Sequence, residues 1–525
     1  MSAERTGSSE LTDAAGDERT GSSVVTGAAG LQNGAGDGVA AQGISFGARI
    51  RELAAQDPDR VVLRFVAIDG AEQAVTMGEL DRRSTQLARE MAGRGLGVGD
   101  RLGLELRNSV DLVACIQAAW KVGAAPVPMR WDLPEWERQR VGQVLAARLV
   151  ITEDDRGIIE AAAGQPTDPV PDVVPPFSNG ICSSGSTGTP KVIMSARPGL
   201  FDADTINPFP AEWGVVIPRP QLILVPTTLY HTNGFATMLS LLAGDALILL
   251  EKFDAARIVD LIERYHVTHF TSTPTMLQRI AALPDIAKRD LSSLNWVMQG
   301  AAVIPPNLVR TWIDLIGAEK LFMAYGMTEA LGLTSIRGDE WLTHPGSVGR
   351  GFRQTEVRIL DAYGRQVPTG EVGEIYLRWP GSGMYQYLGD ASLLPATEDG
   401  FATAGDLGWV DDEGFLYIAD RRIDMIISGG ANVFPAEVES ALLDHPGIAD
   451  VVVVGLKDEQ WGRRVHAIVE PRDPADPPSA ADVIAFAKQR LAAYKVPKTV
   501  EFVSAIPRSA ATKVSRGQLV AERGG

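Results

Sequence analysis

Hydrophobic positions along the chain follow two spacings in turn, which predicts that helices and strands alternate. Apolar residues recur at helical spacing at Leu80, Leu87 and Met91. Short apolar runs that are typical of buried strands occur at residues 101–106, 222–225 and 246–250. Because this rhythm starts near Ile44 and continues to about residue 420, it predicts one large α/β domain over residues 44–420.

The pattern changes near Asp420. Segments 371–377 and 415–418 predict strands of a smaller β-rich unit that closes the large domain. Beyond it, the sequence predicts a helix, two strands, a helix and a strand at residues 436–443, 450–454, 466–470, 481–492 and 499–503. We therefore expect a small α+β domain over residues 425–525, joined to the large domain by a hinge at residues 421–424.

The N-terminal segment, residues 1–43, has a different composition from the rest of the chain. It is rich in Gly, Ala, Ser, Thr and acidic residues, and it repeats Glu-Arg-Thr-Gly-Ser-Ser at Glu4–Ser9 and Glu18–Ser23. Such a segment cannot bury enough apolar surface to offset the entropy lost on ordering, so we predict a disordered tail. It also lacks the basic region and apolar core of a secretory signal.

Length and charge limit the classes of function. A chain of 525 residues is too long for one hydrophobic core and fits two or three domains. The net charge of −17 argues against nucleic acid or an anionic membrane as the main partner, because both attract basic patches. We therefore expect a small-molecule substrate. The sequence leaves open whether the chain is a monomer or a homodimer.

Cysteine content and hydropathy indicate the compartment. The chain has only two cysteines, Cys115 and Cys182, too few for a disulfide framework or a zinc site, which predicts a reducing cytoplasm. The best candidate for a membrane-spanning run, Leu239–Leu250, is short and contains Asp245. We expect a soluble cytoplasmic protein without integral membrane association.

One segment concentrates hydroxyls, glycines and a lysine in a loop of phosphate size. It consists of Ser183, Ser184, Gly185, Ser186, Thr187, Gly188, Thr189, Pro190 and Lys191. Glycines let several backbone N–H groups point at one anion, the hydroxyls add donors, and the lysine adds positive charge. The loop is not a Walker A motif, because Pro190 precedes the lysine and Val192 follows it. Composition alone does not separate such a loop from a solvated linker, so the motifs that follow decide.

Further motifs follow along the chain: Tyr230-His231, Gly300-Ala301-Ala302, Tyr325-Gly326-Met327-Thr328-Glu329, Asp406, Arg421, Ser428-Gly429-Gly430 and Lys513. With the loop, and in this order, they resemble the adenylate-forming superfamily, which includes acyl-CoA synthetases, stand-alone adenylation domains and luciferases. The resemblance runs from about residue 45 to the C-terminus. It implies an α/β fold with a large, multi-subdomain N-terminal adenylate-forming domain and a small, mobile α+β C-terminal lid.

The resemblance also implies how ATP is bound. Lys191 and the loop hydroxyls would hold the β- and γ-phosphates, and Thr328 would contact the α-phosphate. Adenine would stack on Tyr325, within the motif that also holds Gly326 and Met327, against a thin wall of Gly300, Ala301 and Ala302. Asp406 would accept hydrogen bonds from both ribose hydroxyls, with Arg421 approaching from the hinge side.

A metal ion and a second half-reaction are implied as well. Glu329 would hold Mg²⁺, with Thr187 of the loop as a further ligand, because a hard cation prefers a carboxylate together with phosphate oxygens. Lys513 would reach the carboxylate and the α-phosphate during adenylation. Rotation of the lid would then withdraw the lysine and present Ser428, Gly429 and Gly430 to a tunnel for the pantetheine thiol of CoA.

Three positions depart from the family pattern and bear on the second half-reaction. Ile423 stands at the hinge position, where the family commonly has Asp or Lys. Thr512 replaces a glycine before the C-terminal lysine, and Ala404 replaces a threonine before Asp406.

The predicted function is ATP-dependent adenylation of a carboxylic acid followed by transfer to CoA, which releases pyrophosphate and then AMP. One alternative is an adenylate-forming ligase with another acceptor, such as an amide ligase or a nitrite-activating diazotase. Another is a non-catalytic AMP-binding sensor or scaffold, which the intact Lys191, Glu329, Asp406 and Lys513 disfavour.

The acid itself is not specified by the sequence. Candidate pocket residues are His231, Asn233, Phe235, Met298 and Gln299, a lining compatible with aromatic, steroid-like or medium-chain acids. His231 is either a gate that orients the acid or a pocket histidine with satisfied hydrogen bonds. The amides of Asn233 and Gln299 bind either a polar group of the substrate or backbone groups. The Pro-rich stretch Arg197–Pro220 is either a loop on the substrate side or a surface insertion.

Overall fold

The computed structural model describes residues 43–183, 191–203, 206, 209–380, 385–389, 394–421, 424–428, 430–508 and 514–525. The tail predicted for residues 1–43 lies outside this part of the chain except for its last residue. Among these residues no helix is long and apolar enough to cross a membrane.

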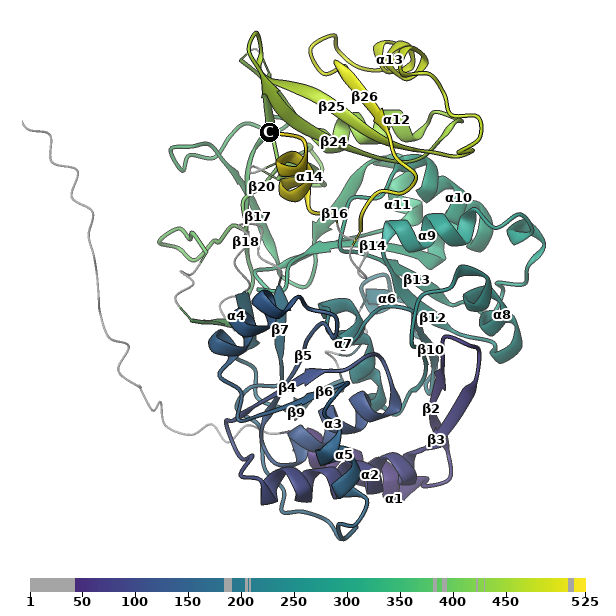
Figure 1. The fold of residues 1–525 in the computed structure, drawn as a ribbon, viewed down its shortest axis with the longest axis vertical. Coiled ribbons are helices and arrows are strands. Elements are labelled where there is room, and N and C mark those ends of the chain that lie inside the picture. The colour runs from purple at the N-terminus through teal and green to yellow at the C-terminus, as the bar shows by residue number, and fades with distance from the viewer. Residues whose placement is uncertain are drawn as a thin grey trace, which may run out of the picture. The chain divides into compact units, whose positions relative to one another are not determined.

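A sheet of thirteen strands runs through the large domain (Figure 1). In sheet order the strands are β17 (Glu356–Leu360), β18 (Gly373–Arg378), β20 (Asp406–Val410), β21 (Leu416–Arg421), β16 (Ser347–Gly351), β15 (Leu333–Arg337), β14 (Leu321–Gly326), β13 (Trp296–Gln299), β12 (His269–Ser272), β10 (Leu222–Val225), β11 (Ala246–Leu250), β2 (Val61–Val66) and β3 (Glu72–Thr76). The stretch from β14 to β2 is parallel and the remaining pairs are antiparallel.

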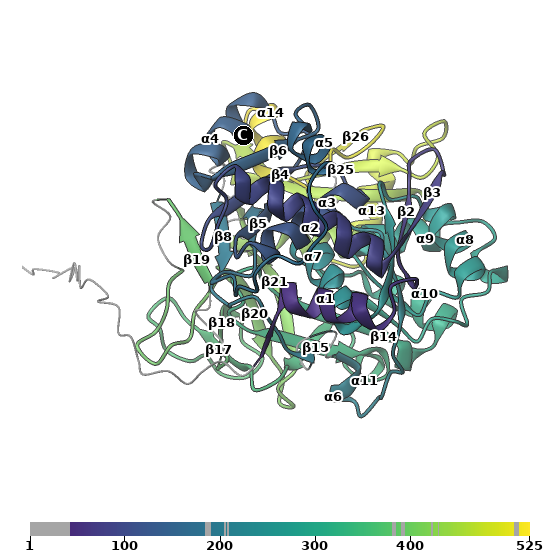
Figure 2. The same cartoon turned by 90° about the horizontal axis from the view of Figure 1, so that it is seen from below.

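Helices cover both faces of the parallel strands, which explains why those strands are continuous apolar runs. Ile223 and Val225 of β10 pack with α1 (Phe46–Gln56), α2 (Met77–Gly93) and α3 (Val110–Lys121). Leu224 packs with α8 (Ala255–Tyr265), α9 (Pro274–Ala281) and α10 (Pro306–Ile316). Figure 2 shows these two groups of helices apart from each other.

Local signals set the ends of these helices. Thr76 caps α2 by accepting a hydrogen bond from the backbone of Glu79, whose carboxylate accepts one from the backbone of Thr76 in return. In α3 every residue from Leu112 to Lys121 is buried, as expected for a helix that is apolar almost all round.

Smaller sheets flank the large one. Strands β5 (Ala125–Pro128), β4 (Arg101–Glu105) and β6 (Leu149–Thr152) form a parallel sheet, and β1 (Ile44–Ser45) pairs with β9 (Leu200–Phe201). An antiparallel sheet has the order β19 (Tyr385–Leu388), β8 (Lys191–Ser195), β7 (Gly180–Ser183). The remaining α-helices of this part are α4 (Glu135–Leu145), α5 (Gly157–Ala162), α6 (Phe209–Glu212), α7 (Thr232–Met238) and α11 (Gly338–Thr343).

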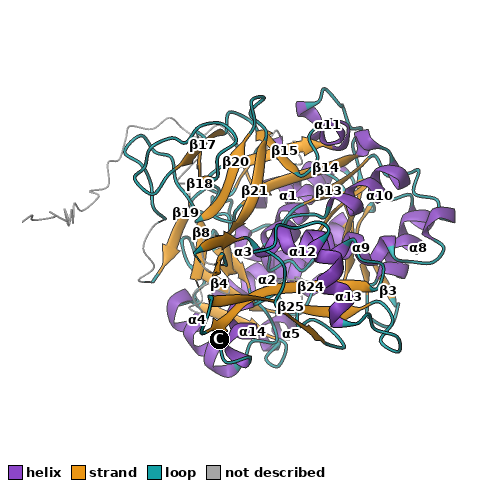
Figure 3. Cartoon of the chain, turned by 90° about the horizontal axis from the view of Figure 1, so that it is seen from above, coloured by secondary structure: helices purple, strands orange, loops and turns teal. Residues whose placement is uncertain are grey.

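The C-terminal residues build their own core. Its elements are β22 (Ile426–Ser428), β23 (Ala431–Val433), α12 (Pro435–Leu443), β24 (Ile448–Asp458), β25 (Gly462–Pro471), α13 (Ala480–Lys488), β26 (Thr499–Phe502) and α14 (Arg516–Glu522). Figure 3 shows the long β24–β25 pair with α12 and α13 beside it. Val438 and Leu442 of α12 pack on Val451 and Val453 of β24, so the predicted α+β organisation is confirmed.

The predicted β-rich unit differs in one respect from the expectation. Its strands β17, β18, β20 and β21 do not form a sheet of their own, because β16 pairs with β15 on one side and with β21 on the other. The unit is therefore continuous with the parallel strands through backbone hydrogen bonds. This continuity places Asp406 and Arg421 in the same sheet as Tyr325.

Candidate active site

The predicted phosphate loop connects β7 to β8. Ser183 at the end of β7 is paired with Lys191 at the start of β8. The loop positions between them, Ser184, Gly185, Ser186, Thr187, Gly188, Thr189 and Pro190, lie outside the described residues. Lys191 is half-buried, and its Nζ lies 4.9 Å from the ring centroid of Tyr387 in β19.

Glu329 lies close to the same tyrosine. The phenol of Tyr387 donates a hydrogen bond of 2.6 Å to Oε1 of Glu329. Glu329 follows β14, and the next residue, Ala330, has a left-handed backbone with φ of +50°. Two residues that the sequence assigned to phosphate and metal therefore both contact one aromatic ring.

Thr328 connects this loop to the start of α7. Its Oγ1 lies 2.9 Å from Oγ1 of Thr232, the first residue of that helix. Gly234 lets α7 pack on the turn that precedes it, because a Cβ at residue 234 would lie 2.2 Å from the carbonyl oxygen of Thr228.

Tyr325, Asp406 and Arg421 form a second cluster. The phenol of Tyr325 donates to Oδ2 of Asp406 at 2.8 Å, and Nε of Arg421 lies 3.4 Å from Oδ1. Burial and the neighbouring carboxylate raise the pKa of the Tyr325 phenol well above its usual value, so the phenol is the donor. Asp406 and Arg421 are direct partners in the register of β20 and β21.

The turn after β13 holds the predicted adenine wall. Ala301 has a φ of +73°, a backbone conformation that is uncommon for alanine. Nε2 of Gln299 donates to the carbonyls of Ala302 at 2.7 Å and Gly300 at 3.2 Å, so its amide supports the turn. Of the two roles considered for this amide, the contacts are those of an amide that binds backbone groups. Nδ2 of Asn233 lies 3.5 Å from the position that a Cβ on Gly300 would occupy, which brings α7 against this turn.

The other predicted acid-pocket residues lie on the α7 side of the sheet. His231 precedes α7, is half-buried, and its ring centroid is 4.4 Å from that of Tyr230. Phe235 is buried in the core and contacts Trp120 edge-on at 6.2 Å. Met298 is also buried, in a cluster with Trp296 and other aromatic side chains.

Sequence reasoning did not identify the aromatic side chains that pack around Met298. Trp213 of the stretch Arg197–Pro220 makes an edge contact of 5.1 Å with Phe322 of β14, and its Nε1 donates to Oε2 of Glu340 at 3.0 Å. Met298, Trp296 and Phe322 form one buried cluster, and Trp213 packs against it, so this stretch lies beside Met298, which the sequence predicts to line the acid pocket. Side chains two positions apart on a strand point to the same face, so the position of Met298 in β13 could have predicted that Trp296 lies beside it.

The C-terminal residues make a further set of contacts, one of which joins them to β21. Oδ2 of Asp420, at the end of β21, accepts a hydrogen bond of 2.9 Å from the backbone of Ala436 in the first turn of α12, and burial raises the pKa of Asp420 to about 6. Arg516 donates to both carboxylate oxygens of Glu439 at 2.8 Å. Gly430 lies at the turn between β22 and β23 with a φ of +82°. Ile423, Gly429, Thr512 and Lys513 lie outside the described residues.

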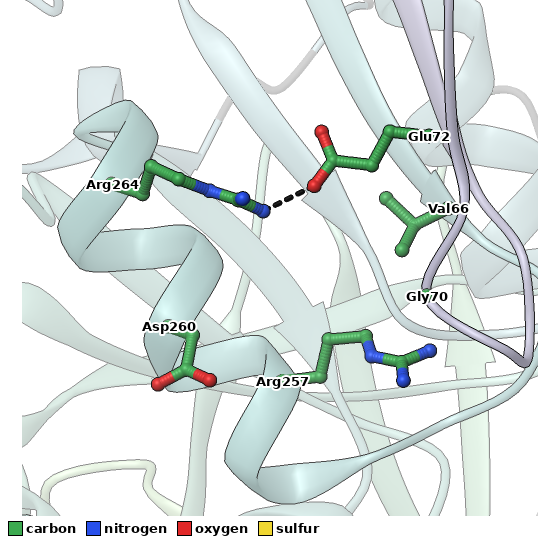
Figure 4. Close-up of a pocket in the computed structure, with 6 residues that line it drawn as sticks. All are labelled: Val66, Gly70, Glu72, Arg257, Asp260 and Arg264. Atoms are coloured by element: carbon green, nitrogen blue, oxygen red, sulfur yellow. Dashed lines mark hydrogen bonds and ion pairs between the residues drawn. The ribbon is translucent and has the colours of Figure 1, made fainter.

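A surface pocket of about 240 Å³ lies away from these clusters, between α8 and the β2–β3 hairpin (Figure 4). Its lining includes Arg264, which forms an ion pair with Glu72, and Arg257, which donates to the carbonyl of Ala67 at 2.7 Å. None of its lining residues belongs to the predicted site. The two arginines join α8 to the β2–β3 hairpin through these contacts.

Comparison with known proteins identifies the family. A sequence model described as AMP-binding enzyme matches residues 50–388, and one described as AMP-binding enzyme C-terminal domain matches residues 437–513. The chain belongs to the AMP-binding enzyme family. The resemblance predicted from the motifs is therefore confirmed.

Relatives of this AMP-binding enzyme align over most of its length. A feruloyl-CoA synthase from Amycolatopsis sp is 32% identical over 466 residues, which cover 85% of this chain and 93% of that protein. A 2-succinylbenzoate–CoA ligase from Bacillus licheniformis is 30% identical, over 90% of this chain and 98% of its own.

Solved structures agree with the fold of this AMP-binding enzyme. The o-succinylbenzoate CoA synthetase from Bacillus subtilis, in complex with its acyl-adenylate intermediate, superposes with a TM-score of 0.77 at 26% identity, over 90% of this chain and 97% of that one. The same synthetase in complex with ATP and magnesium ion has a TM-score of 0.76 at 25% identity, over 90% of this chain and 98% of that one.

Proposed function

We propose that the chain activates a carboxylic acid with ATP at the two side-chain clusters around Tyr387 and Asp406. The chain is an AMP-forming acid–CoA ligase. A carboxylate oxygen of the acid attacks the α-phosphorus of ATP, the new oxygen–phosphorus bond forms as the bond to the bridging oxygen breaks, and pyrophosphate leaves. Both reactants are anionic, so the reaction depends on charge neutralisation more than on acid or base catalysis.

The observation that carries the proposal is the convergence of Lys191 and Glu329 on one ring. Lys191 belongs to β8 and Glu329 follows β14, yet Tyr387 contacts both side chains. A cation and a carboxylate that share one neighbouring side chain suit a triphosphate and its metal ion. Lys191 would neutralise phosphate charge, and Thr328 would donate to the α-phosphate.

Glu329 fits the magnesium ion that the reaction requires. Within the described residues there is no group of three or more His, Cys, Asp or Glu side chains that could hold a metal. Mg²⁺ needs no such cage, because it is commonly bound by one or two carboxylates together with substrate phosphates. When bound, it would neutralise charge on the leaving pyrophosphate.

The ribose and adenine would lie at the Tyr325 cluster. Asp406 accepts a hydrogen bond from Tyr325 and faces Arg421, and these two contacts fix the position of its carboxylate. We infer that the ribose hydroxyls donate to Asp406 and that adenine lies between Tyr325 and the turn at Gly300, Ala301 and Ala302.

The second half-reaction would transfer the acyl group to CoA. The thiol sulfur attacks the acyl carbon, a carbon–sulfur bond forms, the bond to the AMP oxygen breaks, and the thiol proton is lost to solvent. Gly430, with its left-handed backbone, would let the slender pantetheine chain pass close to the lid. Lys513 would act in adenylation only.

We infer that the acid is aromatic or polycyclic. Trp213, Trp296 and Phe322 pack in one cluster with Met298, so an acid that bound beside Met298 would meet aromatic side chains, which suit a flat ring. Relatives include ligases named for feruloyl, 2-succinylbenzoate and indoleacetate substrates.

A reducing cytoplasm is the compartment that fits the cysteines. Burial raises the pKa of the Cys182 thiol to about 12 and raises that of Cys115 as well, which keeps both thiols protonated and unreactive.

The proposal is tested by measuring pyrophosphate release from Mg·ATP across aryl, steroid-like and fatty acids and nitrite. Each is assayed with and without CoA, and the products are identified by mass. We expect acyl-CoA and AMP from an aromatic or polycyclic acid. Turnover with nitrite alone, or only when an amine is added, would assign the chain to the alternative class of ligase.

A further inference from the structure

Tyr387 lies between two residues of the proposed site and has no role assigned so far. Its phenol donates to Oε1 of Glu329 at 2.6 Å, and its ring centroid is 4.9 Å from Nζ of Lys191. Its exposed fraction is only 6%, whereas Lys191 and Glu329 are half-buried, so the tyrosine is the member of this cluster that is shielded from water.

The position of Tyr387 is set by backbone pairing. Strand β19 is antiparallel to β8, and Tyr387 is registered opposite Ile193, close to Lys191 on the same strand. Residue Tyr385 packs edge-on against Tyr387 at 5.3 Å, which restricts rotation of the ring. Tyr387 is therefore held by a sheet, whereas Glu329 lies in a loop.

Each contact has a direct physical consequence. A donor on one carboxylate oxygen fixes the plane of the carboxylate and so the direction of the other oxygen. The face of an aromatic ring attracts an ammonium group within about 6 Å, which keeps Lys191 near the ring. The loop that carries Glu329 is held on its other side by Trp379, whose Nε1 donates to the carbonyl of Ala330 at 2.6 Å.

We propose that Tyr387 is a positioning residue that holds Glu329 for Mg²⁺ and Lys191 for the triphosphate before the nucleotide arrives. The proposal rests on the proposed function, because it assumes that Mg·ATP binds at these two residues. Tyr387 acts through them and does not contact the reacting atoms. Its effect should therefore appear in binding of the metal-bound triphosphate and not in binding of AMP.

The test is isothermal titration calorimetry of the full chain in the absence of the carboxylic acid substrate. One titration uses Mg²⁺ with the β,γ-methylene analogue of ATP, and a separate one uses AMP without metal. Tyr387→Phe keeps the ring and removes the hydroxyl. We expect it to weaken binding of the Mg²⁺ analogue by about ten-fold, as for other groups that orient a metal ligand, and to change AMP binding by less than about two-fold. Tyr363→Phe, which removes a phenol hydroxyl at an exposed position, is the matched control and should leave both affinities unchanged.

A second pair of variants keeps the proposal testable if Tyr387→Phe also perturbs the fold. In a Glu329→Gln background, Tyr387→Phe should have little further effect on the Mg²⁺ analogue, because the two residues act as a unit. Three results would each overturn the positioning role. They are additive losses in this cycle, binding of the Mg²⁺ analogue to Tyr387→Phe that is unchanged or tighter, and a loss of AMP binding as large as the loss of Mg²⁺-analogue binding. Failure of the wild-type chain to bind the Mg²⁺ analogue at all would instead overturn the proposed function.

Discussion

The phenol of Tyr325 donates a hydrogen bond of 2.8 Å to the carboxylate of Asp406, 81 residues further along the chain. The bond joins the strand that leads into Thr328 and Glu329 to the strand that pairs with Arg421. The residues proposed to bind adenine and ribose are therefore joined by a hydrogen bond, and the strand of Tyr325 leads on to those proposed for phosphate and metal.

Tyr325→Phe should weaken the binding of AMP and of ATP alike. The change leaves the ring for stacking but removes the donor from a carboxylate, and hydrogen bonds to charged groups contribute about 1.5–3 kcal/mol. We expect AMP affinity to fall by roughly ten-fold or more, measured by calorimetry. Tyr363→Phe, at an exposed position, is the matched control. Equal affinities for wild type and Tyr325→Phe would show that Asp406 is positioned without this bond.

Trp213→Ala should lower the catalytic efficiency with the acid and leave the binding of ATP unchanged. The indole contacts Phe322 on the wall proposed for the acid, and its loss opens a gap there. The kcat/KM for the preferred acid should fall by about three- to ten-fold, since an aromatic pair contributes about 0.5–1.5 kcal/mol. The KM for ATP should be unchanged. Trp136→Ala, at an exposed tryptophan, controls for general effects, and a matching rise in the KM for ATP would mean that the stretch Arg197–Pro220 supports the whole domain instead.

Lys513→Ala should separate the two half-reactions. Removing a charge that stabilises the adenylation transition state should slow acid-dependent ATP–pyrophosphate exchange by roughly 10²–10³. Thioester formation from synthetic acyl-adenylate should persist at near the wild-type rate. Comparable loss of both activities would refute the division of labour between the two faces of the lid.

Gly430→Leu should have the opposite effect. A branched side chain at a φ of +82° is strained and would enter the proposed pantetheine path. Thioester formation from acyl-adenylate should fall by roughly ten-fold or more, while pyrophosphate exchange is retained. If thioester formation is unaffected, the tunnel does not pass this turn.

His269 should make the fold less stable in mild acid. Burial, with the nearby Arg219 charge, lowers the pKa of His269 from 6.5 to about 3. Below pH 6.5 the unfolded chain takes up a proton that the folded chain does not, so the free energy of unfolding falls by up to about 1.4 kcal/mol per pH unit until the pH nears 3. Between pH 7.5 and 5.0 the wild type should therefore lose about 2 kcal/mol more than His269→Gln.

The measurement is urea-induced unfolding of both proteins at the two pH values, with His266→Asn as the exposed control. Glutamine retains a side-chain amide for the bond that His269 Nδ1 makes with Gln221 Oε1 at 3.0 Å. Parallel losses of stability in wild type and His269→Gln would mean that other groups dominate the acid response.

The alternation of helices and strands was predictable because hydrophobic periodicity is a local property. The run at Leu222–Val225 is a buried strand in the structure, and the residues at Leu80, Leu87 and Met91 lie on the buried face of α2. Motif order added the family and the candidate site residues, because Asp406, Arg421 and Glu329 stand at recognisable places in the chain.

The sequence by itself thus determined the alternating α/β pattern, the smaller C-terminal domain and the family to which the chain belongs. The tertiary structure decided which residues meet: that Tyr325 bonds to Asp406, that Trp213 packs against the cluster of Met298, and that Tyr387 contacts both Glu329 and Lys191. No local signal distinguishes Tyr387 from Tyr385, since they lie two positions apart on one strand. The physical reason is that these contacts depend on which strands pair across long separations, and strand pairing is set by packing of the whole sheet and its helices.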